Sequence, residues 1–315
     1  MGLVFHNGRF VPEQDIKKID EESEVLRLLR SFLDKNEPKL VRVLVNTWNA
    51  QGNAITYKEL REAILAGEIS PDILEDWMQD YSRFVVKYLQ PAWEKAIVTA
   101  ASVIEKKVPL WHFDPMGAGV IEWTAARSAE FVTNVTTTQI EGLRAVVRRA
   151  AVLEDLSVDE LARAIRPMVG LTQQQSVANM KYYETLLASG TSTKKAQELA
   201  TRYAARQHRY RGYNIARTEL AFAYNQGSYE GTKQAQAAGY MGETVKVWCT
   251  ADDERVCQTC GGLEGKEIAM DEDFDFRTKL EGRNATIRRV PPAHPGCRCG
   301  VMYKEISPPI YQNSK

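Results

Sequence analysis

The chain has 315 residues with 41 basic and 41 acidic side chains, so its formal net charge is zero. Hydrophobic residues make up 44% of it and charged residues 26%, an ordinary composition for a soluble protein. The balanced charge argues against a dedicated nucleic-acid-binding protein, and no apolar run approaches the roughly 18 residues that a membrane span requires.

The first part of the chain, residues 1–110, predicts a helical domain. Residues 1–20 show no clear periodicity and are interpreted as an irregular arm. Beyond them, apolar residues recur at three- and four-residue steps, which is typical of amphipathic helices. This pattern predicts helices over residues 23–49, 56–67 and 70–107. Pro38 and Pro91 fall inside two of these helices and should kink or break them.

The middle part, residues 111–240, predicts a second helical domain. We expect helices over residues 121–131, 139–152, 157–169, 172–188 and 192–238. The valines and threonines of residues 132–138 are poor helix formers and predict a break, and Gly212 is a second candidate break. The capping boxes at Thr56 and Ser157, each with Glu three residues later, mark two helix starts.

The last of these helices carries an excess of basic residues. Arg202, Arg206 and Arg209 follow i, i+4, i+7 spacing and share one face. Such a face is suited to contacting phosphates of double-stranded DNA without sequence preference. A solvated or ion-paired face is the plainer interpretation, because aromatic residues that could stack on bases are sparse nearby.

Residues 241–306 predict a small α+β module, followed by a tail at 307–315. Alternating residues predict strands over 245–250 and 301–306, with a long polar loop and one hairpin over 268–289. The expected fold is therefore mainly α, with elongated multi-helix N-terminal and middle regions and β structure confined to this C-terminal module.

All five cysteines of the chain lie between Trp248 and Tyr303. One C-x2-C pair and a second short cluster form two half-sites, a spacing typical of tetrahedral zinc sites. The candidate ligands are Cys257, Cys260, His294, Cys297 and Cys299. Cys257 and Cys260 form the first half-site, and two of the other three should complete the set; which two stays open. Cys249, on a strand-like run, is interpreted as a core residue.

Inert buried thiols and disulfides are the two alternatives to a metal site. Free cysteines often serve only as small buried apolar residues, but here their clustering favours a metal. Disulfides need an oxidising compartment, and the N-terminal residues lack the apolar segment of a signal peptide.

The patterns W-x-T-x-x-D-x-R-V-C-x-x-C, G-K and P-P-x-H-P-x-C-R-C resemble the C-terminal signature of bacteriophage minor head proteins, the Mu F-like head morphogenesis family. The run I-A-R-T-E at Ile215–Glu219 also resembles this family. The residues that carry the C-terminal resemblance are Trp248, Thr250, Asp253, Arg255, Val256, Cys257, Cys260, Gly265, Lys266, Pro291, Pro292, His294, Pro295, Cys297, Arg298 and Cys299.

The resemblance implies a minor head protein of a tailed phage, located in the virion head and in the bacterial cytoplasm during assembly. Its implied partners are the portal protein and the major capsid protein, with a scaffolding protein as a further candidate. The implied roles are head morphogenesis, DNA packaging or genome delivery, without catalysis, and the zinc ion would be structural.

Zinc-dependent enzymes and DNA-binding zinc modules are the alternatives. A nucleobase deaminase places H-x-E before its cysteines, whereas this chain has no H-x-E. A nuclease of the HNH type would need more histidine, and no P-loop or G-x-S-x-G motif marks a transferase or hydrolase. The spacing from Cys260 to His294 far exceeds the roughly 12 residues of a Cys2His2 finger.

Two charged features of the sequence lie on or near the metal module. Glu219 falls on the apolar side of its helix and should need a cationic partner, for which Arg255 and Arg298 are the candidates. The acidic run Asp252–Glu254 is interpreted as a turn with an Asx cap rather than as a metal site.

Overall fold

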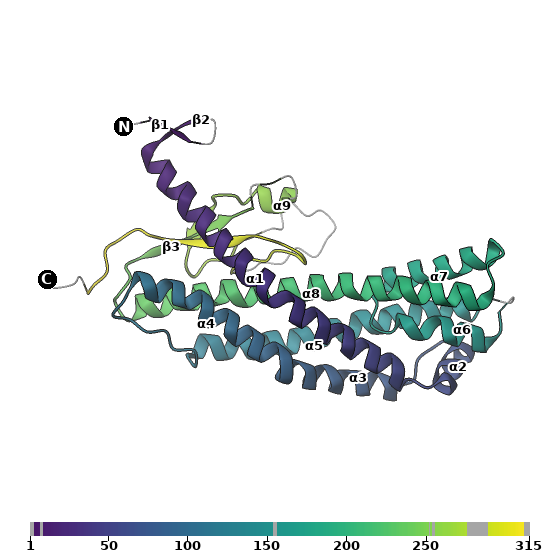
Figure 1. The fold of residues 1–315 in the computed structure, drawn as a ribbon. Helices are drawn as coiled ribbons and strands as arrows, with labels where there is room; N and C mark the ends of the chain where they lie inside the picture. Colours follow the sequence, from purple (N-terminus) through teal and green to yellow (C-terminus); the bar gives the residue numbers. More distant parts are fainter. Residues whose placement is uncertain are drawn as a thin grey trace. The chain divides into compact units, whose positions relative to one another are not determined.

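The structure is a computed structural model that describes residues 3–6, 9–153, 156–251, 253, 256–275 and 289–311. It is mainly helical, with a small antiparallel sheet near the C-terminus, as the sequence predicts (Figure 1). Within this part of the chain, no helix is both long and apolar enough to cross a membrane.

The α-helices are α1 (Glu13–Ala54), α2 (Tyr57–Ala66), α3 (Pro71–Phe84), α4 (Gln90–Lys107), α5 (Ala118–Ala150), α6 (Val158–Ile165), α7 (Gln173–Ala188), α8 (Thr193–Ala237) and α9 (Gln258–Gly261). A π-helical segment, η1 (Val85–Leu89), joins α3 to α4, and a 3-10 turn, η2 (Arg166–Met168), follows α6. The strands are β1 (Leu3–His6), β2 (Arg9–Pro12), β3 (Thr244–Cys249), β4 (Glu267–Ala269) and β5 (Gly300–Glu305).

Local capping signals place the helix ends where the sequence predicts them. The Thr56 and Ser157 capping boxes both form, so each hydroxyl accepts a backbone N–H and each Glu carboxylate accepts one in return. Gly67 ends α2 and Gly190 follows α7, with φ of 71° and 82°. These left-handed conformations favour glycine because it has no Cβ.

Breaks predicted at three places are absent from the described helices. α1 continues through Pro38, and buried leucines on either side of it, Leu33 and Leu40, show that packing holds both flanks. α5 is one helix across residues 132–138, where Val135 and Thr136 are buried. Burial of such a face outweighs the few tenths of a kcal/mol per residue of poor propensity. α8 likewise runs through Gly212.

The predicted irregularity at Pro91 is present as a π-helical turn. Gln90 N–H reaches back to the carbonyl of Val85, five residues earlier. Proline cannot donate a backbone N–H, and a π turn is one of the usual ways in which a helix adapts to such a residue.

The prediction that β structure is confined to the C-terminal module is wrong. The prediction of an irregular arm over residues 1–20 is wrong as well. β1 and β2 pair antiparallel, with Val4 opposite Val11 and His6 opposite Arg9. The two residues between them are Asn-Gly, the strongest dipeptide signal for a hairpin, and this signal was missed.

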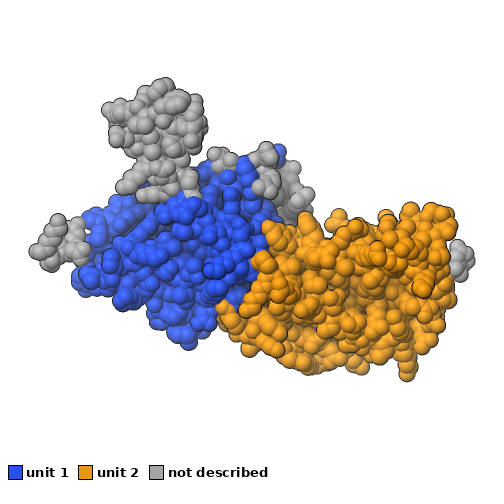
Figure 2. Space-filling view, in the orientation of Figure 1, with its two compact units in different colours: residues 1–37, 92–122, 217–315 blue, residues 38–91, 123–216 orange. Residues whose placement is uncertain are grey.

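The chain divides into two compact units, each built from separate segments (Figure 2). Unit 1 comprises residues 1–37, 92–122 and 217–315, and unit 2 comprises residues 38–91 and 123–216. The core of unit 2 gathers buried residues of α2, α3 and α5–α8, among them Trp77, Leu161 and Tyr183. The domain boundaries expected at 110/111 and 240/241 stay a prediction.

The C-terminal part of unit 1 contains the predicted strands. β3 lies in the centre of a three-stranded antiparallel sheet, with β4 on one side and β5 on the other. Trp248 of β3 pairs with Val301 of β5, so the end of β3 lies beside the start of β5. The end of β3 precedes the first half-site and the start of β5 follows the second, so this pairing brings the two half-sites together. Much of the predicted 268–289 loop lies outside the described residues.

Candidate metal centre

The first half-site is built on a single helical turn. Cys257 is the N-cap of α9, and its Sγ accepts the backbone N–H of Cys260 at 3.4 Å. This contact folds the C-x2-C segment so that both sulfurs lie on one side of the turn. Cys260 is 2% exposed, whereas Cys257 lies at the surface.

The second half-site is a tight turn that leads into β5. The N–H of Cys297 donates to the carbonyl of His294 at 3.1 Å, which closes the turn. Gly296 within it has φ of 75°, a conformation that other residues adopt only with strain. Cys299 directly precedes Gly300, the first residue of β5.

The structure brings all five predicted ligands together. Cys257 Sγ lies 3.2 Å and Cys260 Sγ 3.4 Å from Nε2 of His294, and Cys260 Sγ lies 3.8 Å from Cys297 Sγ. Ligand atoms of two overlapping groups lie within 4.8 Å of one another: Cys257, Cys260 and His294, and Cys260, Cys297 and Cys299.

These separations fit a tetrahedral zinc ion. A Zn–S bond of about 2.3 Å implies sulfur–sulfur edges of about 3.8 Å, and a Zn–N bond of about 2.0 Å implies sulfur–nitrogen edges of about 3.5 Å. A disulfide would need sulfurs about 2.05 Å apart, far closer than the sulfurs of Cys260 and Cys297 at 3.8 Å. The donor set therefore suits a soft, thiolate-binding cation.

The electrostatics of the buried sulfurs also favour a cation. Hydrogen bonds from Cys260 and Cys299 hold the pKa of Cys297 well below its usual range. Its hydrogen bond and negative charge in turn raise the pKa of Cys260. The pKa of Cys299 is raised as well, because Cys297 and burial outweigh a hydrogen bond with Cys260 that lowers it. The negative charge of one thiolate thus opposes deprotonation of the neighbouring thiols. A bound cation would offset the repulsion between the negative sulfurs and allow them to deprotonate.

His294 is oriented by its own turn. Its Nδ1 lies 3.0 Å from the carbonyl of Pro295, so an Nδ1–H donor leaves Nε2 as the free ligand atom. Burial lowers the pKa of His294, but this hydrogen bond and the nearby Cys297 charge raise it overall. Fixing the tautomer through the second nitrogen is the usual arrangement around a metal-ligating histidine.

Cys249 is not part of the cluster. It is fully buried on β3 and packs in a separate apolar group with Val247 and Met302, as predicted for a core residue.

The charged residues near the cluster differ in part from expectation. Arg298 donates to both carboxylate oxygens of Asp253, at 2.6 and 2.7 Å, a bidentate pair that the sequence did not reveal. Glu219 is 4% exposed, which agrees with its predicted apolar surroundings. The partner of Glu219 stays a prediction, because Arg255, one of its two candidates, lies outside the described residues. Two residues of the predicted acidic turn, Asp252 and Glu254, also lie outside them.

Two residues of α8 that contact the second half-site were missed. Thr218 Oγ1 accepts the N–H of Gly296 at 3.1 Å, and Asn225 Nδ2 donates to the carbonyl of Cys299 at 3.5 Å. Thr218 lies within the Ile215–Glu219 run, so that run was the available signal. No local pattern marked Asn225.

The basic residues of α8 separate into two groups. Arg202, Arg206 and Arg209 are exposed; Arg202 pairs with Glu198, and Arg206 lies over the ring of Tyr203. Arg211 belongs to the second group because it is 6% exposed and donates to the Gly170 carbonyl and to Thr138. Arg217 pairs with buried Glu37. All three arginines of the predicted basic face are therefore exposed, whereas Arg211 and Arg217 of the same helix serve internal contacts.

Comparison with protein families gives one match. Residues 146–302 match the model of the family described as phage Mu protein F like protein. Searches of curated proteins and of solved structures gave no significant match. The matched region begins in α5, includes all of α8 and ends within β5, so it contains the whole cysteine–histidine cluster. Residues 146–302 of this chain therefore belong to the phage Mu F-like family.

Proposed function

We propose that this protein is a minor head protein of a tailed bacteriophage that acts in head morphogenesis, with a structural zinc ion in its C-terminal module. Membership of the Mu F-like family over residues 146–302 carries this proposal. The cluster supports the metal, because its separations fit a tetrahedral site and three of its cysteines are almost fully buried.

The zinc ion would be held by Cys257, Cys260 and two of His294, Cys297 and Cys299. Bound zinc adds its binding free energy to the folding of a small module. The cysteines themselves form part of that module's core, together with Trp248 and Phe274. Up to five candidate ligands around one ion suit a closed structural site better than a catalytic site, which keeps one position open.

The proposed location is the virion head, with the portal protein and the major capsid protein as partners and a scaffolding protein as a further candidate. The proposed role involves no catalytic turnover. A hydrolytic or transferase activity that is lost in a folded Cys257→Ser variant would overturn this part.

The test combines metal analysis with head assembly. Purified protein should contain one zinc ion per chain by elemental analysis. Cys257→Ser and Cys297→Ser should each lower zinc content, protein yield and incorporation into heads together, because all three depend on the folded module. Cys249→Ala is the matched control, since that cysteine lies outside the cluster, and it should retain zinc. Full incorporation of a zinc-free variant would contradict the structural role.

The exposed arginines of α8 favour a second, subsidiary role in contacting double-stranded DNA. Arg202, Arg206 and Arg209 lie on one helix face and reach solvent. Changing all three to Gln should leave head assembly intact but impair DNA packaging or delivery. If heads that contain the triple variant package and deliver DNA normally, this arginine face is only a solvated, ion-paired surface.

A further inference from the structure

A hydrogen bond from the glycine at the centre of the second half-site connects that half-site to α8. Gly296 lies between the candidate ligands His294 and Cys297, and its N–H donates to Thr218 Oγ1 at 3.1 Å. The same short turn is closed by the 3.1 Å hydrogen bond from Cys297 to the carbonyl of His294. Any shift of Gly296 therefore displaces both ligands.

A second contact from the same helix holds the third candidate ligand. Asn225 follows Thr218 by seven residues, about two helical turns, so both project from one face of α8. Its Nδ2 donates to the carbonyl of Ala221 at 2.9 Å and lies 3.5 Å from the carbonyl of Cys299. The next residue, Gly300, packs so tightly that an added Cβ would lie 3.0 Å from Val25 Cγ1.

α8 is itself fixed at this point. Arg217, the neighbour of Thr218, donates to both carboxylate oxygens of Glu37 on α1, at 2.7 and 3.3 Å. Glu37 is 3% exposed, and a buried ion pair of this kind is costly to break. Thr218 therefore lies next to a buried ion pair that joins α8 to α1 within unit 1.

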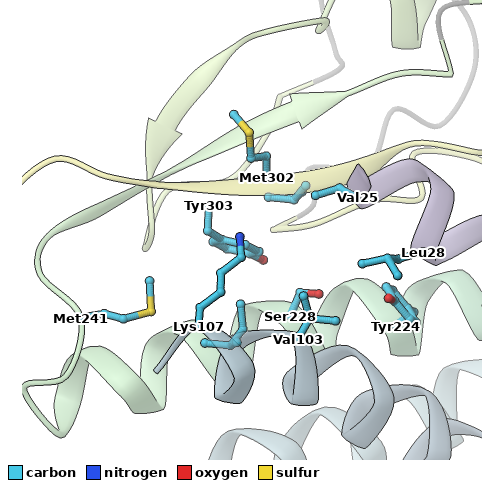
Figure 3. A pocket seen from close by; sticks show the side chains of 11 residues that line it. Val25, Leu28, Val103, Lys107, Tyr224, Ser228, Met241, Met302 and Tyr303 are labelled. Carbon is cyan, nitrogen blue, oxygen red and sulfur yellow. The ribbon is translucent and has the colours of Figure 1, made fainter. Parts of the chain in front are cut away.

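Apolar packing beneath β5 is incomplete. A cavity of about 70 Å³ lies among α1, α4, α8 and β5 and is lined by residues such as Leu28, Tyr224 and Met302 (Figure 3). The cavity leaves part of this face of β5 without apolar contact, although Val301 and Met302 belong to buried apolar clusters.

We propose that Thr218 is a positioning residue for the metal centre, which holds the His294–Cys297 turn in ligating geometry, with Asn225 as a second support at Cys299. This inference rests on the proposed zinc site. Residues that orient metal ligands in this way typically change metal affinity by about 10–100-fold when they are removed.

The experiment measures zinc affinity in the full-length protein by competition with a colorimetric chelator. Thr218→Val keeps the shape of the side chain but removes the hydroxyl, and it should weaken zinc binding by about tenfold. Thr218→Ser keeps the hydroxyl and should bind like the wild type. Thr232→Val is the matched control, because Thr232 is a buried threonine of the same helix whose hydroxyl donates to the carbonyl of Ser228, within the helix itself.

The outcomes separate the inference from the proposed function. Wild-type protein that binds no zinc would overturn the proposed zinc site, on which this inference rests. Zinc-binding wild type with equal affinity in Thr218→Val and Thr232→Val would overturn the positioning role alone. A merely structural role would lower the melting temperature of the zinc-bound and zinc-free forms of Thr218→Val equally, without a specific loss of zinc affinity.

A measurement on the wild type keeps the inference testable if Thr218→Val does not fold. In the zinc-bound protein, the amide of Gly296 should exchange slowly with solvent, since it is hydrogen-bonded to Thr218. Exchange at the rate of a free amide would contradict the proposed contact.

Discussion

At the scale of single residues, unit 2 buries a histidine beside an arginine. His208 is 4% exposed, its Nε2 lies 2.8 Å from the carbonyl of Val169, and its ring stacks on Trp48 with centroids 5.5 Å apart. The guanidinium of Arg211 lies 5.2 Å from the same Trp48 ring. Burial, together with the Arg211 charge, lowers the pKa of His208 to about 4, so the ring is neutral in the folded protein at pH 7.

This shift predicts acid sensitivity of unit 2. His208 takes up a proton near pH 6.5 in the unfolded chain and only near pH 4 in the folded protein. The contribution of neutral His208 to the free energy of unfolding is therefore fully present above pH 6.5 and is lost as the pH falls towards 4. The full effect would be about 3 kcal/mol. His208→Gln should unfold in urea with a flatter pH dependence over this window. Parallel curves for variant and wild type would contradict the assignment.

At the scale of elements, α4 and α8 approach closely through two glycines spaced one turn apart. A Cβ on Gly227 would lie 2.4 Å from the carbonyl oxygen of Ile97, whereas one on Gly231 would lie 3.3 Å from Ala101. The contact at Gly227 could form only if the backbone moved, whereas the contact at Gly231 would be close but possible with a small shift. The helix pair thus depends on Gly227 much more than on Gly231.

The glycine pair gives a matched prediction. Gly227→Ala should lower the free energy of unfolding by about 2 kcal/mol, because overpacking exceeds the roughly 1 kcal/mol by which Ala favours a helix. Gly231→Ala should be close to neutral. Thermal unfolding of the two variants tests this difference, and equal effects would show that the backbone relaxes readily.

At the scale of the whole molecule, the candidate metal centre belongs to unit 1, while unit 2 has a large apolar core of its own. The core beside the metal centre is small and includes Cys260, Cys297 and Cys299 themselves. Removing a metal from such a module removes the ion that links these buried sulfurs and the binding free energy that it adds to folding.

Chelation should therefore act locally. After zinc is removed, amides of β3 and β5 should exchange faster with solvent, whereas those of α6 and α7 should keep their protection. Hydrogen exchange followed by mass spectrometry distinguishes these segments. Unchanged exchange in β3 and β5 of zinc-free protein would show that the sheet does not need the metal.

Much of this architecture was predictable because its signals are local. The Thr56 and Ser157 caps need only neighbours three residues away, and apolar periodicity marks a helix within a few turns. The two half-sites were equally visible, because the spacings C-x2-C and H-x2-C-x-C directly limit where the ligand atoms can lie.

The remaining features depended on contacts between residues far apart in the chain. Packing carried α5 across its weak segment and α1 through Pro38, and no local propensity reveals such support. Arg211 and Arg202 look alike in the sequence, yet one is buried and the other exposed. Thr218 contacts a turn 78 residues away. Sequence alone determined where most helices begin and end and which residues are candidate metal ligands. Tertiary structure decided which helices continue across weak segments and which side chains support the ligands, because burial and hydrogen-bond partners exist only once distant segments meet.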